Sequence, residues 1–184
     1  LVPGGKYHTV QTGSLRKVDS FLIGKFEVTQ AQWSKVMEEN PSAFVGPDRP
    51  VENVSWYDVD EFIRRLNEKS DRHYRLPTEV EWEYAAQTRG RGHRWAGTNE
   101  PDQLLDYAWL RENADGKSHP VGTKKANGLA LHDMSGNVWE WCSDWYDTKG
   151  SQRDAMTPRG RVIRGGSWML DPGYALTTAR ESAA

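Results

Sequence analysis

The chain has 184 residues, with 24 basic and 26 acidic side chains and a formal net charge of −2. A surface that follows a phosphate backbone is normally basic, so this balance argues against nucleic-acid binding. No apolar run approaches 18 residues, so we expect no membrane-spanning segment. The single cysteine, Cys142, excludes an intramolecular disulfide and a cysteine-based zinc site.

Aromatic residues and turn formers dominate the rest of the composition. The chain contains nine Trp and seven Tyr, together with 17 Gly and nine Pro. Trp covers a large area at low entropic cost, and Gly and Pro mark defined turns. This composition predicts a fold rich in fixed loops. Cys142 lies in an aromatic stretch, where a buried small hydrophobic role is expected.

The first predicted elements lie between residues 17 and 39. Weak alternation of apolar residues from Lys17 to Phe26 predicts a strand. Thr29 to Gln32 forms a capping box, in which Gln32 can reach back to the Thr29 N–H. The helix that begins there is expected to end before Asn40-Pro41, because the residue before a proline disfavours the helical region.

Two further helices follow. Ser55 with Asp58 three residues later starts the first of them, and its apolar positions at 59, 62, 63 and 66 give the clearest amphipathic pattern in the chain. Thr78 with Glu81 is a capping box that starts the next, with Trp82, Ala85 and Ala86 pointing inward. Glu79, Glu81 and Glu83 are interpreted as stabilising that helix N-terminus, with Arg75 and Arg164 as their buried partners.

The second half changes from helix to strand. Residues 88–127 show no sustained period, and a loop of this length is usually functional or pinned by an ion or by packing. Residues 135–137 predict a turn, residues 138–146 a strand, and residues 161–168 a second strand that bends at Gly165-Gly166. Early helices followed by late antiparallel strands indicate an α+β fold.

Strand alternation puts Trp139 and Trp141 on the face opposite Val138, Glu140 and Cys142. These two Trp could form a sugar-stacking platform or pack in the core. The Glu-Pro-Asn type of calcium motif that a lectin sugar site uses is missing from the sequence. We therefore predict that Trp82, Trp139 and Trp141 belong to the core, while Trp168 and Tyr174 lie nearer the surface.

Six segments, in this order, resemble the formylglycine-generating-enzyme (sulfatase-modifying factor) family. They are VPGG at 2–5, GKFEVT at 24–29, PVENVSW at 50–56, YRLPTEVEWEYAA at 74–86, DMSGNVWEW at 133–141 and RVIRGGSW at 161–168. The resemblance implies one domain over residues 1–184 with a variant of the C-type lectin fold: a small antiparallel sheet with flanking helices and long loops. Members usually continue past the position of Arg180 to a closing strand, so we expect that C-terminal strand to be missing here.

The resemblance also implies what the chain does not do. Active members of the family carry two cysteines that bind copper and oxidise a substrate cysteine, and the matching positions here are Leu170 and Ala175. Neither side chain can form a thiolate or bind a soft metal. The five His show no metal-ligand spacing. We therefore predict a protein without copper and without catalytic activity. An oxidoreductase of the same family with other chemistry and a structural component of an envelope complex remain as alternatives.

Residues 133–140 resemble a calcium loop of the family. Carried over residue by residue, the ligands are the side chains of Asp133 and Glu140 and the carbonyl oxygens of Gly136 and Val138. Hard cations accept such mixed carboxylate and carbonyl oxygens. The alternative is a plain turn, in which Asp133 caps an N–H group and Glu140 pairs with an arginine.

The same fold is used by variable proteins of diversity-generating retroelements, which vary their C-terminal end and bind diverse ligands. The matching stretch here is residues 169–178. The contact residues expected from this resemblance are Trp168, Asp171, Tyr174, Leu176 and Thr178. The expected ligand is a protein or another macromolecule, bound by a monomer at the bacterial cell surface or elsewhere outside the cytoplasm.

Overall fold

The computed structural model describes residues 1–9, 12–147 and 160–183. Its helices are α1 (Gln30–Ser34), α2 (Trp56–Glu68), α3 (Glu79–Ala86) and α4 (Leu104–Tyr107), with short 3₁₀ turns at Pro101–Gln103 (η1) and Pro172–Ala175 (η2). Its strands are β1 (Gly5–His8), β2 (Leu15–Val18), β3 (Glu140–Trp145), β4 (Arg161–Arg164) and β5 (Glu181–Ala183). The predicted α+β class is confirmed. Within these described ranges, no helix is long and apolar enough to cross a membrane.

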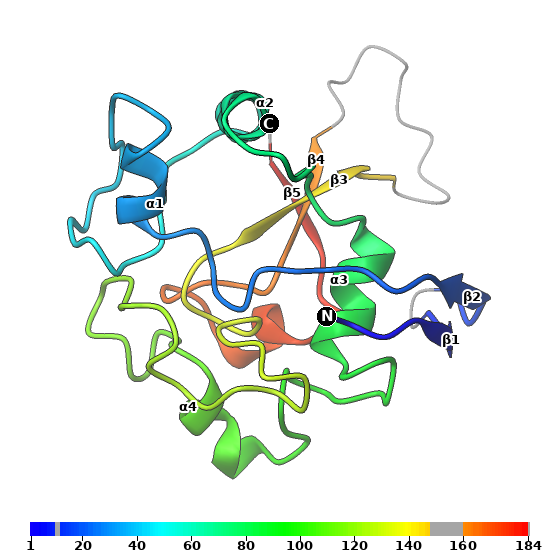
Figure 1. Cartoon of the computed structure of the whole chain (residues 1–184). Helices are drawn as coiled ribbons and strands as arrows, with labels where there is room; N and C mark the ends of the chain where they lie inside the picture. The colour runs from blue at the N-terminus through cyan, green and yellow to red at the C-terminus, as the bar shows by residue number, and fades with distance from the viewer. Residues whose placement is uncertain (10–11, 148–159, 184) are drawn as a thin grey trace, which may run out of the picture.

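The central sheet is antiparallel, with strand order β3-β4-β5. Glu140 lies opposite Arg164 and Trp141 opposite Ile163, and the register shifts between Trp141 and Trp145. Helix α3 packs beside this sheet, and the β1-β2 hairpin projects from the far side of α3 (Figure 1). Strand β5 pairs along β4 and was not predicted from the sequence.

The three predicted helix starts are confirmed. At Thr29, Ser55 and Thr78 the side chain accepts a hydrogen bond from the backbone three residues on, and the side chain there accepts one from the cap backbone. The predicted end of the first helix is wrong, because α1 stops at Ser34. The residues that follow are held by side chains instead: Trp33 Nε1 donates to the Glu39 carbonyl oxygen over 2.8 Å.

The strand predicted from Lys17 to Phe26 is also wrong in extent. Only Leu15–Val18 forms a ladder with β1, and beyond it Phe21 makes an isolated bridge to Val2. On the β1 side of this hairpin, Pro3 lies two residues before Gly5, the first residue of β1. Proline has no N–H group to donate to a ladder. Alternation alone cannot show where the partner strand stops.

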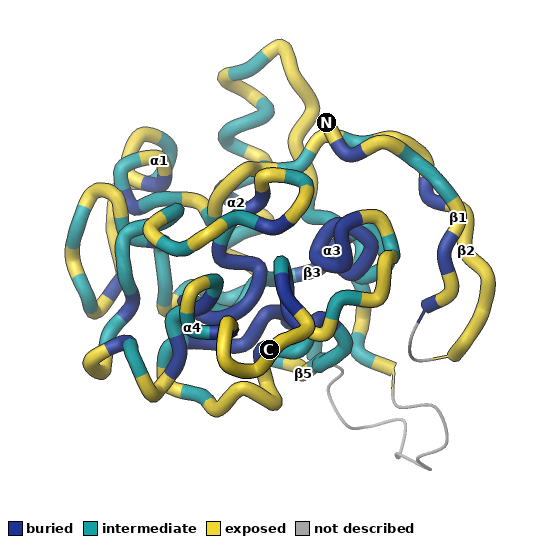
Figure 2. Tube along the Cα trace, turned by 90° about the horizontal axis from the view of Figure 1, so that it is seen from below, coloured by how far each residue is buried: buried dark blue, intermediate teal, exposed yellow. Residues whose placement is uncertain are grey.

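The main core forms where α3 meets the sheet and the hairpin. Trp82 and Cys142 are fully buried there, as expected, together with Val162. Figure 2 shows α3 as the most continuously buried helix. A second core lies under the long 88–127 segment and contains Trp95, Leu104, Ala108, Leu110 and Ala175. Packing therefore pins this segment, which also contains α4.

Trp139 and Trp141 are only partly buried, so their prediction as core residues is wrong. The predicted alternation itself holds, but the opposite face is the one turned toward α3: Cys142 is 0% exposed, and Glu140 bonds Trp82. Trp141 uses its Nε1 to donate to the Val54 carbonyl oxygen over 3.2 Å. Trp141 therefore lies on the face of β3 turned away from α3, whereas Trp139 precedes the strand.

Candidate functional site

The loop that precedes β3 holds a buried carboxylate in an uncommon conformation. Asp133 has a φ of 60° and is 3% exposed. Its Oδ2 accepts a hydrogen bond of 2.6 Å from the Gly122 N–H group. Its Oδ1 is buried and has no hydrogen-bond partner among the described residues. An unpaired buried carboxylate oxygen is costly, so this position is suited to a cation.

Glu140 shares the same environment. Its Oε2 accepts a hydrogen bond of 3.0 Å from Trp82 Nε1, and no described arginine forms an ion pair with it. The arginine pairing of Glu140 that the plain-turn alternative requires is therefore not found among the described residues. Burial raises the pKa of Glu140 to about 7. Burial also raises the pKa of Asp133.

A third carboxylate, Glu27, was not identified from the sequence. It accepts hydrogen bonds from Asn137 Nδ2 (2.6 Å) and the Val138 N–H group (3.1 Å). Burial raises its pKa, and the charges of Asp133 and Glu140 raise it further. Glu27 lies in the family-like segment 24–29, but its partners Asn137 and Val138 are 110 and 111 residues away along the chain, which no local pattern can show.

These three carboxylates repel one another when charged, which a bound cation would relieve. Among the residues that the structure describes, no three Asp, Glu, His or Cys side chains are arranged as a metal cluster. A site made of the Asp133 and Glu140 side chains with the Gly136 and Val138 carbonyl oxygens does not need a third side chain. Oxygen-only ligands of this kind fit calcium.

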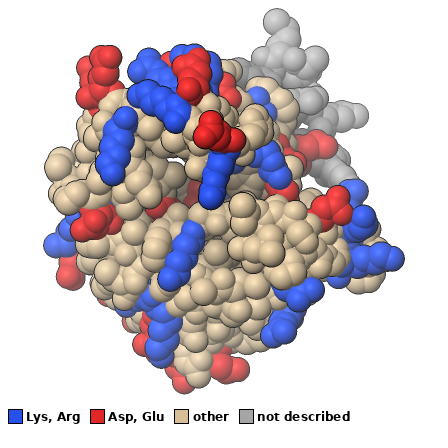
Figure 3. Space-filling model, in the orientation of Figure 1, with Lys and Arg blue, Asp and Glu red and all other residues tan. Residues whose placement is uncertain are grey.

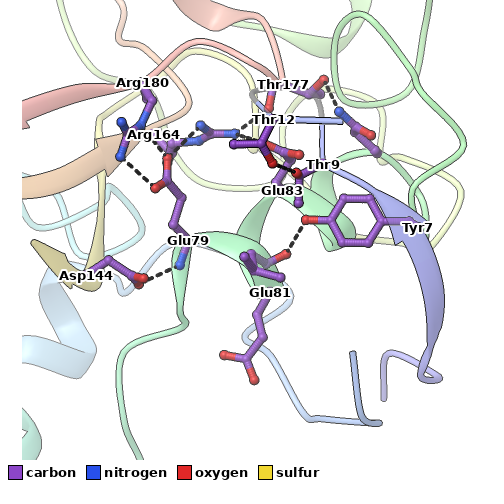
Figure 4. Close-up of polar contacts among 12 residues, drawn as sticks. Tyr7, Thr9, Thr12, Glu79, Glu81, Glu83, Asp144, Arg164, Thr177 and Arg180 are labelled. Atoms are coloured by element: carbon purple, nitrogen blue, oxygen red, sulfur yellow. Dashed lines mark hydrogen bonds and ion pairs between the residues drawn. The ribbon is translucent and has the colours of Figure 1, made fainter. Parts of the chain in front are cut away.

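One carboxylate, that of Glu79, binds the arginines at both ends of the C-terminal segment 165–180. Arg164, at the end of β4, is 0% exposed and donates to Glu79 Oε1 and Glu83 Oε2 over 3.0 Å each. Arg180, just before β5, donates to both oxygens of Glu79 over 2.8 Å. Figure 4 shows both guanidinium groups directed at Glu79, the first residue of α3. The predicted role of Arg164 as a buried partner of these acids is confirmed.

The other predicted partner, Arg75, differs. It donates to Glu81 Oε1 over 2.6 Å, but its side chain is 53% exposed, so its prediction as a buried partner is wrong. The chain turns at Gly165-Gly166 as predicted, but the predicted strand over residues 161–168 is too long, because β4 ends at Arg164. Both residues have positive φ, 92° and 77°, which favours glycine, and a Cβ on Gly166 would lie 2.9 Å from the Tyr174 carbonyl oxygen.

The segment contains both buried anchor positions and exposed positions. Ala175 and Thr177 are 0% exposed. The Ala175 carbonyl oxygen accepts from Ser135 Oγ over 2.8 Å, and Thr177 Oγ1 donates to the His93 carbonyl oxygen over 2.6 Å. Tyr174, by contrast, is 44% exposed. These two anchors fix the backbone, and residues 171–174 before them are exposed.

The five expected contact residues differ in how far their side chains are exposed. Asp171 and Tyr174 are exposed, whereas Trp168 and Thr178 are partly buried. Leu176 is partly buried and packs against the second core. Leu170 and Ala175, the positions of the family cysteines, are partly and fully buried, and Ala175 is part of that core.

The fold and the fixed C-terminal segment define an α+β domain of the C-type lectin-like type. The model of the sulfatase-modifying factor enzyme 1-like domain matches residues 1–184, and the chain belongs to this family. It is 33% identical to the chaperone protein LppX of Paenibacillus barcinonensis, over 92% of the chain and 78% of that protein. It is 32% identical to the formylglycine-generating enzyme of Streptomyces coelicolor, over 80% of the chain and 51% of the enzyme, and so spans about half of that enzyme's length.

Solved structures agree with this assignment. Treponema denticola variable protein 1 superposes with a TM-score of 0.84 at 30% identity, covering 100% of the chain and 87% of that protein. PvdO from Pseudomonas aeruginosa superposes with a TM-score of 0.78 over 99% of the chain and 86% of PvdO. At 23% identity, PvdO shows the shared fold alone.

Proposed function

We propose that this domain binds a macromolecular ligand through its C-terminal segment and catalyses no reaction. The observation that carries the proposal is that residues 164–180 contain both buried positions that hold the fold and exposed positions that do not. Arg164, Ala175, Thr177 and Arg180 are committed to the scaffold, whereas Asp171 and Tyr174 are exposed. A variable protein needs this separation, because its contact residues must change without loss of the fold. The similarity to Treponema denticola variable protein 1 supports the same function.

The separation can be tested directly. Simultaneous replacement of Asp171, Tyr174 and Thr178 should leave the melting temperature nearly unchanged. Asp171 and Tyr174 are exposed, where substitutions usually change stability by less than about 0.5 kcal/mol each, and Thr178 is only partly buried. Thr177→Val is the matched control from the same segment. It should cost about 1–3 kcal/mol, because the buried hydroxyl group donates to the His93 carbonyl oxygen. If the triple variant melts like the control, these residues belong to the scaffold and the proposal is wrong.

The binding capacity needs a second test. A yeast-displayed library randomised at Trp168, Asp171, Tyr174 and Thr178 is selected against hen lysozyme. Folded clones with lysozyme affinity are expected. A library that stays folded but yields no such clone would contradict a binding role for this segment.

The enzyme alternative rests on the family, since relatives such as the Streptomyces coelicolor protein are formylglycine-generating enzymes. We propose that this chain lacks that activity and tight copper binding, because Leu170 and Ala175 cannot supply thiolates. The test is incubation of the domain and copper with a cysteine-containing sulfatase peptide, followed by mass spectrometry. Appearance of formylglycine would overturn the proposal.

We further propose that calcium binds at Asp133, Gly136, Val138 and Glu140 and has a structural role. The unpaired Asp133 Oδ1 and the raised pKa of Glu140 support this site. The ion would fix the loop that leads into β3. Because Ser135 Oγ donates to the Ala175 carbonyl oxygen, the same loop also supports the C-terminal segment.

The proposed ligand is a protein or another macromolecule and not a nucleic acid. Basic and acidic side chains are interspersed over the face shown in Figure 3, in keeping with the net charge of −2. Non-specific nucleic-acid binding would need a basic surface. We propose a monomer located outside the cytoplasm, at the bacterial surface, which fractionation of cells that produce the full-length protein would test.

A further inference from the structure

Arg94 is an exposed cation that is fixed beside the C-terminal segment. Its carbonyl oxygen accepts a hydrogen bond of 2.9 Å from the Thr177 N–H group, and its own N–H group donates to Asn99 Oδ1 over 2.7 Å. Its guanidinium group lies over the ring of Trp95, with 4.4 Å between Cζ and the ring centroid. Trp95 is 2% exposed, and its Nε1 donates to the Pro172 carbonyl oxygen over 3.0 Å. The backbone and the side chain of Arg94 are therefore both attached to the residues that hold η2.

The charge of Arg94 has no partner in the part of the chain that the structure describes. No ion pair joins it to a described Asp or Glu, and its guanidinium group donates to none of the described residues. The other arginine beside this segment differs, because Arg111 NH1 lies 3.1 Å from Asp171 Oδ1. Asp171 is the only charged residue among the five expected contact residues, and Arg111 neutralises it. Arg94 therefore gives this end of the segment a net positive charge.

The position of Arg94 does not suit a role in stabilising the end of α3. Cations favour the C-terminus of a helix, but the effect falls off within the last turn. Helix α3 ends at Ala86, and Arg94 lies eight residues further along the chain. Its backbone is bonded to Thr177 instead. The contacts of Arg94 thus connect it with the C-terminal segment and not with the helix.

A single fixed guanidinium group suits a carboxylate. Its planar fork of N–H groups can bind both carboxylate oxygens at once. A nucleic acid or another phosphate polymer binds through several cations together, and here the second arginine is already paired with Asp171. A side chain that is held in place before binding also loses less entropy on binding. The charge at this position therefore favours an acidic patch on a protein over a phosphate polymer.

We propose that Arg94 is a specificity-determining contact residue, which selects protein ligands that present an Asp or Glu side chain opposite η2. This inference rests on the proposed function, and it adds a residue of the long 88–127 segment to the contact surface at residues 168–178. A charge at the edge of an interface acts mainly on the association rate and on its dependence on salt. Arg94 should therefore speed the association with acidic proteins, and high salt should weaken this effect.

Three yeast-displayed libraries test the inference with two probe proteins, acidic ovalbumin and basic hen lysozyme. All three are randomised at Trp168, Tyr174 and Thr178. Asp171 is retained in each of them, so that Arg111 stays paired and adds no free charge. Differences between the libraries then depend on the residues that are altered outside the C-terminal segment.

The libraries differ at two arginines. The first keeps both of them, the second contains Arg94→Gln, and the third contains Arg16→Gln with Arg94 retained. Arg16 is the matched control for the loss of one positive charge, because it is exposed on β2. The β1-β2 hairpin projects away from the orange-red turn η2, on the other side of α3 (Figure 1).

Against ovalbumin, the first and third libraries should give clones about tenfold tighter than the second, with no such difference against lysozyme. Introducing Arg94→Gln into those clones should remove the gain through a slower association, while the melting temperature stays constant. A lower melting temperature with equal losses against both probes would overturn the inference, because Arg94 would then only support the fold. Binding of single-stranded DNA by the unaltered domain that depends on Arg94 would overturn the choice of an acidic protein.

Two further outcomes separate this inference from the proposed function. Equal affinities for ovalbumin from all three libraries would overturn the role of Arg94 and leave the proposed function intact. Failure of all three libraries to yield folded binders of either probe would count against the proposed function itself.

Discussion

The carboxylate of Glu79 holds the guanidinium group of Arg180 through two hydrogen bonds of 2.8 Å. The same carboxylate binds Arg164 at the other end of the segment. Glu79→Gln keeps the shape of the side chain and removes its charge, so the buried Arg164 keeps only Glu83 as its ionised partner. Breaking a buried ion pair on one side costs about 3–5 kcal/mol. We expect a fall in melting temperature of roughly 10 °C for a domain of this size.

Hydrogen exchange distinguishes a local role of Glu79 in holding segment 165–180 from an effect on the stability of the whole domain. Hydrogen exchange should rise within residues 165–180 of the Glu79→Gln variant more than in α2. Arg111→Gln is the control, because the Arg111–Asp171 pair is 61% exposed on both sides and such pairs contribute at most about 1 kcal/mol. Uniform exchange through the whole domain would contradict a specific role for Glu79 in closing the segment.

The Trp residues should differ sharply in their effect on stability. Trp82 is 0% exposed and its Nε1 is bonded to Glu140, so Trp82→Ala should cost about 3–5 kcal/mol or unfold the domain. Trp139→Ala and Trp141→Ala remove rings that are only partly buried, and each should cost about 1–2 kcal/mol. Urea denaturation of the three variants provides the comparison. Equal losses would show that the outer face is packed as tightly as the core.

The pH dependence of stability should report on Glu140. Its folded-state pKa of about 7 lies above its ordinary value, so between about pH 4.5 and pH 7 the folded protein binds more protons than the unfolded chain. Without calcium, this group's contribution therefore falls as pH rises through that window and is lowest above pH 7. Glu140→Gln should flatten the pH profile of the melting temperature. A slope of opposite sign in the unaltered protein would show that Glu140 is charged and compensated in the calcium-free fold.

Local signals in the sequence predicted the helix starts correctly and the extent of the strands poorly. A capping box such as Thr78 with Glu81 is complete within four residues, so its geometry follows from the sequence alone. A strand exists only where a partner runs beside it. Alternation from residue 17 to 26 therefore could not show that β2 ends at Val18, and the short β5 pairing along β4 gave no signal of its own.

The residues of the candidate site were predictable from the sequence only where they lie in contiguous motifs. Family-like segments located Asp133, Glu140 and the C-terminal stretch, because those motifs are contiguous. Glu27 was missed, since it meets Val138 only in the folded chain. The outward position of Trp141 was missed for a similar reason: alternation defines two faces of a strand, and only the packing of α3 decides which one is buried.

Calcium should stabilise the domain through Asp133. Ligand that binds only the folded state adds about 2.7 kcal/mol at a hundredfold excess over Kd, which corresponds to roughly 5–10 °C in melting temperature. Asp133→Asn retains an oxygen that can accept from the Gly122 N–H group, but it removes the charge that the ion needs, and should abolish the shift. Asp106→Asn is the control, because Asp106 is an exposed carboxylate paired with Lys125 and is not one of the proposed ligands.

The two variants should also differ in the absence of calcium, which makes the test specific. Asp133 is buried with Oδ1 unpaired and adds to the charge repulsion on Glu27, so the Asn variant should melt at or above the temperature of the chelator-treated wild type. Melting curves in chelator and in excess calcium, with calorimetric titration of the metal, measure both effects. If chelator leaves the wild-type melting temperature unchanged and titration gives no heat, residues 133–140 form a turn without a metal ion.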